Sequence, residues 1–168
     1  ITLFAGETFT QCPLTVDHAV LLDMIHNIKC GLITDGTAVG MGIANAVTRL
    51  KDSKAKSKVI ILLTDGTNNK GDISPMTAAE IAKSFGIRVY TIGVGTNGMA
   101  PYPYPVGNTV QYVSMPVEID EKTLTEIAGT TDGNYFRATS NSKLKEVYEE
   151  IDKLEKTKLN VKAVSYTH

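Results

Sequence analysis

The chain has 168 residues, of which 42% are hydrophobic and 21% charged, and its formal net charge is -1. This composition is typical of a globular protein with one hydrophobic core, so we expect a single domain over residues 1–168. The dispersed Lys and Arg residues argue against a nucleic-acid partner, and no apolar run reaches the ~20 residues of a membrane helix. Cys12 and Cys30 lack zinc or redox spacing, and two free buried thiols are predicted, with a disulfide as the alternative.

The N-terminal part predicts a β-hairpin and then two helices. Ile1 to Phe4 and Thr8 to Leu14 are strand-like on either side of a short turn. Thr15 to Asp17 can cap a helix that runs through Ile28, and a second helix is predicted for Ala38 to Leu50. The first helix has apolar residues at helical spacing, and we expect them to form a buried face: Val20, Leu21, Met24, Ile25 and Ile28. The glycines Gly40 and Gly42 indicate close packing near the start of the second helix.

A strand, a helix and a second strand follow. Val59 to Leu63 is apolar without alternation, which indicates a parallel strand buried on both faces. Pro75 suits the first turn of a helix over Ser74 to Phe85, and Ile87 to Val94 is the next strand. Such a unit makes its two strands parallel. We therefore predict an α/β, Rossmann-like fold with a mostly parallel central sheet flanked by helices and an antiparallel edge hairpin.

Residues 97–116 form a Tyr- and Pro-rich excursion with a predicted hairpin around Gly107-Asn108. It is interpreted either as a protein contact surface or as a lid folded back over the core. Beyond it, a helix capped by Asp120 is predicted to run to about Ala128, a strand from Asn134 to Ala138, and a last helix capped by Ser142. The last helix would turn inward the side chains of Leu144, Val147, Tyr148, Ile151 and Leu154. Residues 159–168 are expected to form an extended C-terminal tail.

Two candidate sites are rejected on spacing. Gly93 to Gly98 fits G-x-G-x-x-G, but the prolines that follow exclude the helix that a dinucleotide site needs. His18 and His26 are eight residues apart on one helix, about 12 Å, so they cannot share a metal ion.

Oxygen ligands at loop ends remain. Thr37 precedes a helix and Asp65 follows the strand over Val59 to Leu63, so both can reach the carboxyl edge of one sheet. A hydroxyl and a carboxylate are hard ligands that suit Mg²⁺. The alternative is that Thr37 caps a helix and Asp65 caps a turn.

Three segments, Val59 to Gly66, Asp35 to Ala38 and Val89 to Gly95, together resemble the von Willebrand factor type A (VWA) domain. Within that family, Phe4 to Thr15 and Pro116 to Glu121 are most similar to the bacterial aerotolerance-operon (Bat-type) proteins. The resemblance covers nearly the whole chain.

The resemblance implies a metal-ion-dependent adhesion site with Thr37 and Asp65 as ligands to Mg²⁺, with Mn²⁺ or Ca²⁺ as alternatives. The family's other ligands come from an Asp-x-Ser-x-Ser loop after its first strand. This sequence contains no such loop, and the strand at Ile1 corresponds to the family's second strand. We therefore expect that an N-terminal segment is omitted here, or that another chain fills the gap.

The function that the resemblance implies is protein binding rather than catalysis. An acidic residue of a partner protein would complete the metal site, and Tyr102, Tyr104 and Tyr112 are candidate partner-surface residues. The whole protein is expected to be anchored in a bacterial inner membrane, with this domain in the periplasm. The alternatives are a metal-independent scaffold of a membrane complex, or a metal-assisted phosphoester hydrolase that would add Asp35 and Asp72 to Asp65.

Overall fold

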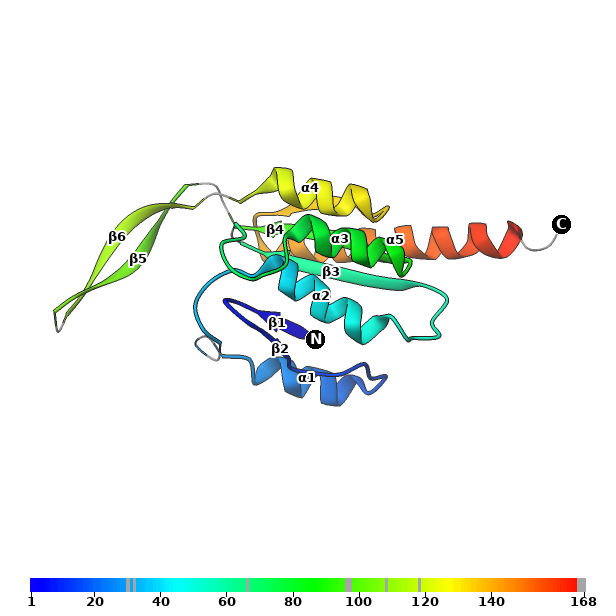
Figure 1. The fold of residues 1–168 in the computed structure, drawn as a ribbon, viewed down its shortest axis with the longest axis horizontal. Coiled ribbons are helices and arrows are strands. Elements are labelled where there is room, and N and C mark those ends of the chain that lie inside the picture. The colour runs from blue at the N-terminus through cyan, green and yellow to red at the C-terminus, as the bar shows by residue number, and fades with distance from the viewer. Residues whose placement is uncertain are drawn as a thin grey trace.

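The computed structural model describes residues 1–29, 31, 33–65, 67–95, 98–107, 109–117 and 119–165. Figure 1 shows the elements as a layered α/β body from which one hairpin projects. In chain order they are β1 (Thr2–Phe4), β2 (Thr8–Thr10), α1 (His18–His26), α2 (Val39–Leu50), β3 (Lys58–Thr64), α3 (Pro75–Ser84), β4 (Ile87–Val94), β5 (Gly98–Val106), β6 (Thr109–Val117), α4 (Glu121–Thr130), β7 (Tyr135–Ala138) and α5 (Asn141–Ser165).

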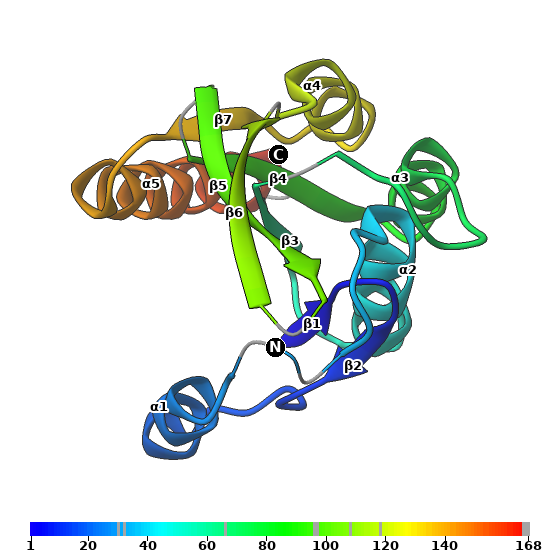
Figure 2. The ribbon, with the colours of Figure 1, turned by 90° about the vertical axis from the view of Figure 1, so that its left-hand side faces the viewer.

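The central sheet of the described residues has the strand order β3-β4-β7, and both of its pairings are parallel. The predicted α/β fold with a mostly parallel sheet is therefore confirmed. The helices α2, α3 and α4 cover one face of this sheet, and α5 covers the other (Figure 2). Strand β4 lies in the middle, and its residues Val89, Tyr90 and Ile92 are 0% exposed.

The predicted burial of β3 on both faces is wrong. Ile60 and Leu62 are buried, whereas Ile61 and Leu63 are 38% and 39% exposed. β3 is an edge strand of the sheet, and its second face opens onto a cavity instead of a packed layer. An apolar run shows that a strand can be buried on both faces, but the neighbours decide whether it is.

The predicted N-terminal hairpin is present as β1 and β2, with Leu3 paired to Phe9. Within the described residues it forms a separate two-stranded sheet and does not extend β3. The cavity lies between this hairpin and β3, with residues of both in its wall. Cys12, just after the hairpin, is buried and free as predicted, and Cys30 lies outside the described residues.

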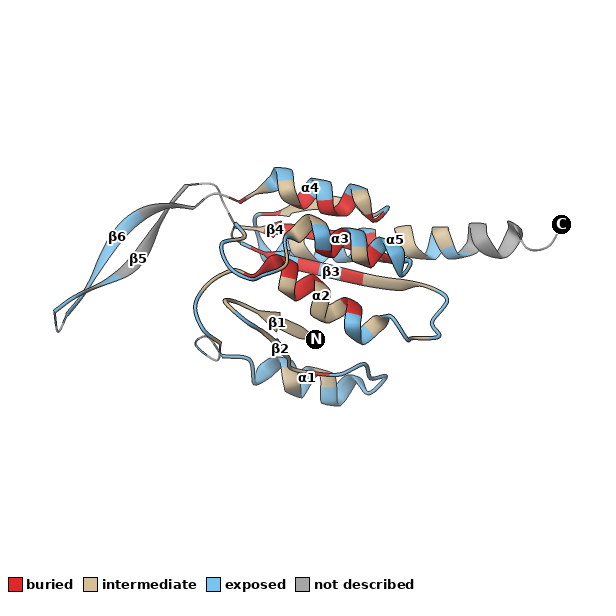
Figure 3. Ribbon diagram, viewed as in Figure 1, coloured by how far each residue is buried: buried red, intermediate tan, exposed pale blue. Residues whose placement is uncertain are grey.

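Helix α1 begins where the sequence predicts, because the Asp17 carboxylate accepts hydrogen bonds from the backbone N–H groups of Ala19 and Val20 at 3.0 and 3.1 Å. Its predicted buried face is wrong: none of its residues is buried, and Val20 and Ile25 are 43% and 42% exposed (Figure 3). Helical spacing identifies an apolar face, but a buried face also needs an element packed against it.

Gly40 and Gly42 pack closely at the start of α2, as predicted. A Cβ atom at Gly40 would lie 2.0 Å from the carbonyl oxygen of Ile73, and one at Gly42 would lie 3.0 Å from the ring of Phe4. These two contacts bring α2 against the segment before α3 and against β1.

The Tyr- and Pro-rich segment forms the hairpin of β5 and β6, whose strands pair from Gly98↔Val117 to Val106↔Thr109. The predicted hairpin around residue 107 is therefore present, although Asn108 itself lies outside the described residues. The hairpin extends away from the body and does not fold back over the core as a lid (Figures 1 and 2).

The extended tail predicted for residues 159–168 is wrong, because α5 continues through Ser165. Extending an existing helix adds one hydrogen bond for each residue fixed, and this favours continuation over a new extended segment. The helix also starts earlier than predicted: the Ser140 hydroxyl, not that of Ser142, accepts a hydrogen bond from the backbone N–H of Lys143 at 3.2 Å. Val147 and Ile151 of its predicted inner face are buried, whereas Tyr148 is 43% exposed.

A polar cluster fixes α5 to the sheet at the start of β4. The Glu155 carboxylate accepts hydrogen bonds from the Ser57 hydroxyl at 2.8 Å and the Tyr90 hydroxyl at 2.6 Å, and it pairs with the Arg88 guanidinium. The Lys158 ammonium group lies 5.7 Å from the centre of the Tyr90 ring. Each of these contacts holds the long helix against β4 or the loop before β3.

Candidate functional site

Thr37 and Asp65 both line one cavity, whose volume is about 1140 Å³. Asp65 follows the last residue of β3, and Thr37 lies two residues before α2. Thr64 pairs with Gly93 in the parallel ladder, so Asp65 lies at the carboxyl edge from which β4 leads toward the projecting hairpin. The structure thus brings the two predicted ligand residues to the wall of a common space.

The Thr37 backbone is held by the loop that follows Asp65. The Asn69 side-chain oxygen accepts a hydrogen bond from the Thr37 N–H at 2.8 Å, and the Asn69 N–H donates to the Thr37 carbonyl at 3.0 Å. The Asn68 side-chain oxygen accepts from the Val39 N–H at 2.9 Å and so caps α2 in place of Ala38, which has no side-chain oxygen. The asparagine loop that follows Asp65 therefore clamps the backbone of the segment that carries Thr37.

Sequence reasoning did not identify Asn68 and Asn69. Asparagine is a typical helix-capping residue, but here each side chain serves a segment about thirty positions earlier in the chain. The only local signal was the pair of adjacent asparagines after a strand end, and that pattern is equally typical of a turn.

The turn between β1 and β2 holds the other end of the Thr37 segment and the residues just before it. Ala38 N–H donates to the Ala5 carbonyl at 2.7 Å, and Gly6 N–H donates to the Thr34 carbonyl at 2.7 Å. A Cβ atom at Gly6 would lie 2.6 Å from the carbonyl oxygen of Asp35, so this approach requires glycine.

The chemistry at this edge is that of oxygen donors. Within the described residues, neither the Asp65 carboxylate nor the Thr37 hydroxyl makes a hydrogen bond or an ion pair. Asp35 also lines the cavity and is exposed, whereas Asp72 is exposed and is not among the lining residues. In the part of the chain that the structure describes, no group of three or more His, Cys, Asp or Glu residues could hold a metal ion. Thr37 and Asp65 are thus oxygen-donor residues in the wall of one cavity.

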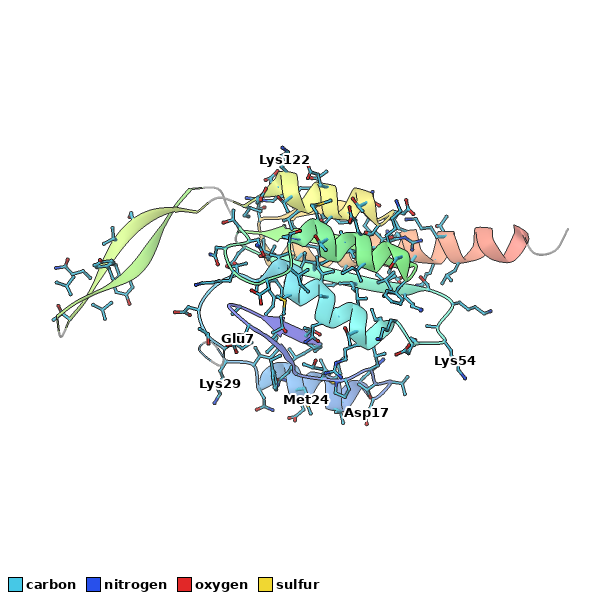
Figure 4. All side chains as sticks on the ribbon, in the orientation of Figure 1. Glu7, Asp17, Met24, Lys29, Lys54 and Lys122 are labelled. Atoms are coloured by element: carbon cyan, nitrogen blue, oxygen red, sulfur yellow. The ribbon has the colours of Figure 1, made fainter. Side chains whose placement is uncertain are left out.

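The rest of the cavity wall is largely apolar. It includes Ile61 and Leu63 of β3, Leu3 of the N-terminal hairpin, and Leu21 and Ile25 of α1. Figure 4 shows the side chains of α1 and the neighbouring hairpin, including Met24, whose backbone carbonyl accepts a hydrogen bond from the Gln11 side chain at 3.1 Å. The candidate ligands thus lie in the wall of an apolar space beside an open strand edge.

Other residues singled out by sequence have structural roles or are solvated. The segment after Gly95 leads into strand β5 and not into a helix, which removes the dinucleotide interpretation. His18 and His26 are exposed on α1. Asp120 caps α4: hydrogen bonding to Thr123, whose backbone N–H lies 3.0 Å away, holds the pKa of the Asp120 carboxyl below its usual value.

The aromatic candidates lie on the projecting hairpin. Tyr104 and Tyr112 are 58% and 72% exposed, and the Tyr102 side chain lies outside the description. Among the described residues, no helix is both long and apolar enough to cross a membrane.

Comparison with known proteins agrees with this fold. Residues 1–150 match the von Willebrand factor type A domain. The crystal structure of the conserved hypothetical protein BatB from Bacteroides thetaiotaomicron is similar, with a TM-score of 0.76 and 34% identity over 92% of this chain and 78% of that one. An aerotolerance-related membrane protein from Bacteroides fragilis gives a TM-score of 0.73 and 30% identity over 90% of this chain and 77% of that one.

A more distant solved structure is described as carrying a metal. Proximal thread matrix protein 1 from the mussel byssus, with a zinc-occupied MIDAS motif, has a TM-score of 0.68 and 27% identity over 92% of this chain and 33% of that one. Among curated proteins, a UPF0353 protein from Nocardia farcinica is 30% identical over 89% of this chain and 48% of its own length. The chain thus spans about half of that relative. It belongs to the von Willebrand factor type A domain family and is similar to that family's bacterial Bat-type proteins.

Proposed function

We propose that this domain is a protein-binding module whose metal site, at Thr37 and Asp65, accepts a carboxylate from a partner protein. The observation that carries the proposal is the clamp: Asn69 holds both backbone groups of Thr37, and Thr37 lines the same cavity as Asp65. A threonine with a held backbone and an aspartate in the wall of the same cavity offer the oxygen donors that suit a hard divalent cation such as Mg²⁺, with Mn²⁺ or Ca²⁺ as alternatives.

The residues present would contribute one negative charge and one neutral oxygen to such a cation. When bound, the cation would supply the positive charge that attracts an acidic side chain of the partner. Thr37 and Asp65 would orient the site, and further ligands would come from water, the partner or residues outside those described. The zinc-occupied MIDAS motif of the similar mussel protein supports the proposal.

The proposed partner-binding surface also includes the β5–β6 hairpin. Tyr104 and Tyr112 are exposed on an element that follows β4, and β4 ends at the same sheet edge as Asp65. Exposed tyrosines are typical of protein-binding surfaces because they bury a large area with few rotatable bonds. We therefore include them, with Tyr102, in the surface that contacts the partner.

Metal binding itself can be tested with the ion alone. Mn²⁺ should broaden the amide resonances around Thr37, and Mg²⁺ should compete with it. We expect Asp65→Ala and Thr37→Ala to abolish this effect, and Asn69→Ala to weaken it because the clamp is lost. Asp72→Ala is the matched control, since Asp72 is an exposed carboxylate in a nearby loop outside the cavity wall. Broadening that survives Asp65→Ala would contradict the proposal.

A metal-independent scaffold is the second candidate, and the largely apolar cavity wall favours it. If a partner binds equally well with Mg²⁺ and with EDTA, and both site variants retain binding, the scaffold function replaces the adhesion-type function. Turnover of a phosphoester that is lost with Asp65→Ala would indicate a hydrolase instead, although Asp72 does not join Asp65 at the cavity.

We also propose that the whole protein is held at a bacterial inner membrane with this domain in the periplasm. The support is the description of the Bacteroides fragilis protein as a membrane protein. Fractionation of cells that express the whole protein, followed by protease treatment of spheroplasts, tests this. Recovery in the soluble fraction, or protection of the domain from protease, would contradict it.

A further inference from the structure

The β5–β6 hairpin exposes apolar side chains and carries no charge. Residues 98–117 contain no Asp, Glu, Lys, Arg or His. Val110 and Tyr112 are 58% and 72% exposed, and the hairpin projects from the body (Figure 1). A two-stranded hairpin alone in water is marginally stable, and natural edge strands usually carry charges that prevent pairing. An uncharged projecting hairpin therefore needs an explanation.

The prolines determine which backbone groups of the hairpin are free. In an antiparallel pair, residues alternate between positions that bond to the partner strand and positions that point away from it. Proline has no N–H and therefore fits only at the second kind. The three prolines of β5 occupy alternate positions and share this orientation: Pro101, Pro103 and Pro105.

The register carries the same orientation to β6. The residues paired with these prolines are Ser114, Tyr112 and Val110, so their N–H groups point away from β5 toward the outer edge of β6. All three are exposed. The two outer edges of the hairpin therefore differ: that of β5 lacks three donors, whereas that of β6 offers three. Pro116, at the same kind of position, ends the series of donors near the body.

We propose that the outer edge of β6 pairs antiparallel with β6 of a second copy of this chain and forms a four-stranded sheet. A two-fold axis at Tyr112 would pair Tyr112 with its own copy and Val110 with Ser114 of the second chain. This register uses all three donors of each chain. An axis one residue further toward the body would place Val110 opposite Pro116, and one residue nearer the tip would place Ser114 beyond the strand.

A second copy fits this edge for two physical reasons. The ribbon is uncharged, so two copies meet without like-charge repulsion, and an edge with evenly spaced donors is complementary to itself around a two-fold axis. The prolines of β5 then block further strand addition, so the assembly closes as a dimer and does not grow into a fibre. This inference does not depend on the metal site or on the proposed function.

The first test removes one backbone donor. Sedimentation equilibrium of the chain, with EDTA present, should show a reversible dimer. Tyr112→Pro removes the N–H at the two-fold axis and with it two intermolecular bonds, while the bonds within the hairpin remain. We expect dimerisation to weaken about thirtyfold, because each backbone bond contributes about fivefold. Tyr112→Ser is the matched control: it also loses the ring but keeps the N–H, and it should dimerise more tightly than Tyr112→Pro.

The second test reads the register directly and does not depend on a proline variant folding. In a background with Cys12→Ala and Cys30→Ala, Tyr112→Cys should form an intermolecular disulfide on mild oxidation, since paired Cα atoms lie about 5.5 Å apart. Val110→Cys should not, because its two copies would be four residues, about 13 Å, apart along the strands. A chain that stays monomeric, or that cross-links equally at both positions, would overturn the proposal. Binding of some other extended peptide at this edge would not rescue it.

Discussion

Replacing Glu155 by alanine should destabilise the domain more than removing any exposed ion pair on the same helix does. The Glu155 and Arg88 side chains are only 14% and 18% exposed, and the Tyr90 hydroxyl donates to the same carboxylate. Removing the carboxylate leaves a mostly buried guanidinium and a buried hydroxyl without their acceptor. Breaking a fully buried pair costs about 3–5 kcal/mol, and the partial exposure of both partners favours the lower end, about 3 kcal/mol of unfolding free energy.

The matched control is Asp152→Ala, one turn earlier on α5, where the pair with Lys156 is 61% and 69% exposed. This variant should lose less than about 0.5 kcal/mol, because exposed helix pairs contribute little. Urea unfolding followed by circular dichroism measures both, and thermal melting of Glu155→Ala should fall by roughly 6–12 °C for a domain of this size. Equal losses for the two variants would refute the assignment of Glu155 as the anchor of α5.

Two further predictions follow from packing and from proton linkage. Gly40→Ala should lower the free energy of unfolding by about 2–4 kcal/mol, because the new Cβ would lie 2.0 Å from a backbone oxygen. Gly129→Ala, in α4 with nothing within 4 Å of the new Cβ, should raise it by about 0.5–1 kcal/mol. Urea unfolding measures both variants, and similar effects would contradict the packing argument. Burial raises the pKa of the Glu155 carboxyl, but hydrogen bonds from Tyr90, Ser57 and Arg88 outweigh it and leave the pKa below 4.5, so its stabilising contribution is present above pH 4.5 and is lost as the pH falls through the folded-state pKa. Burial, with the hydrogen bond to Glu155, raises the pKa of Tyr90 to about 12, so stability should also fall as the pH rises from 10 toward 12; Glu155→Gln should flatten the acid limb, and an unchanged acid limb would refute the linkage.

The parts of the fold that sequence predicted well are those governed by local rules. Ser74 and Pro75 start α3 as predicted, with the Ser74 hydroxyl accepting from the Thr77 N–H at 3.1 Å. The apolar runs of β3 and β4 gave strands, and the helix between them made those strands parallel. Caps, turns and crossover units are encoded within a few residues of one another, so a single sequence contains their signal.

The errors at α1 and β3 arose because neighbours distant in sequence decide whether an apolar face is buried. The apolar faces of α1 and β3 were identified, but Ile25 and Ile61 line a cavity instead of packing against another element. Glu155 shows the reverse: a residue expected to be solvated is surrounded by other side chains. Its residue type and position suggest a solvated helix face, yet three side chains from β4 and the loop before β3 surround it. The periodicity of apolar residues predicts which way a side chain points, but not which part of the chain, if any, packs against it.

The candidate site depends both on local rules and on contacts between residues distant in sequence, so only part of it could be predicted. Asp65 could be placed because it ends an apolar strand, and Thr37 because it precedes a helix. Asn69 could not, because its function is to bond a backbone thirty-two residues earlier, and no periodic pattern records such a contact. The clamp would nevertheless matter to the proposed site: a threonine on an untethered loop would sample many positions, and ordering it on ligand binding would cost conformational entropy. Because Asn69 holds the Thr37 backbone within the fold itself, much of that entropy is already lost before a ligand would bind, and this is the physical reason to expect the asparagine loop, and not only the two candidate ligand residues, to set the affinity of the proposed site.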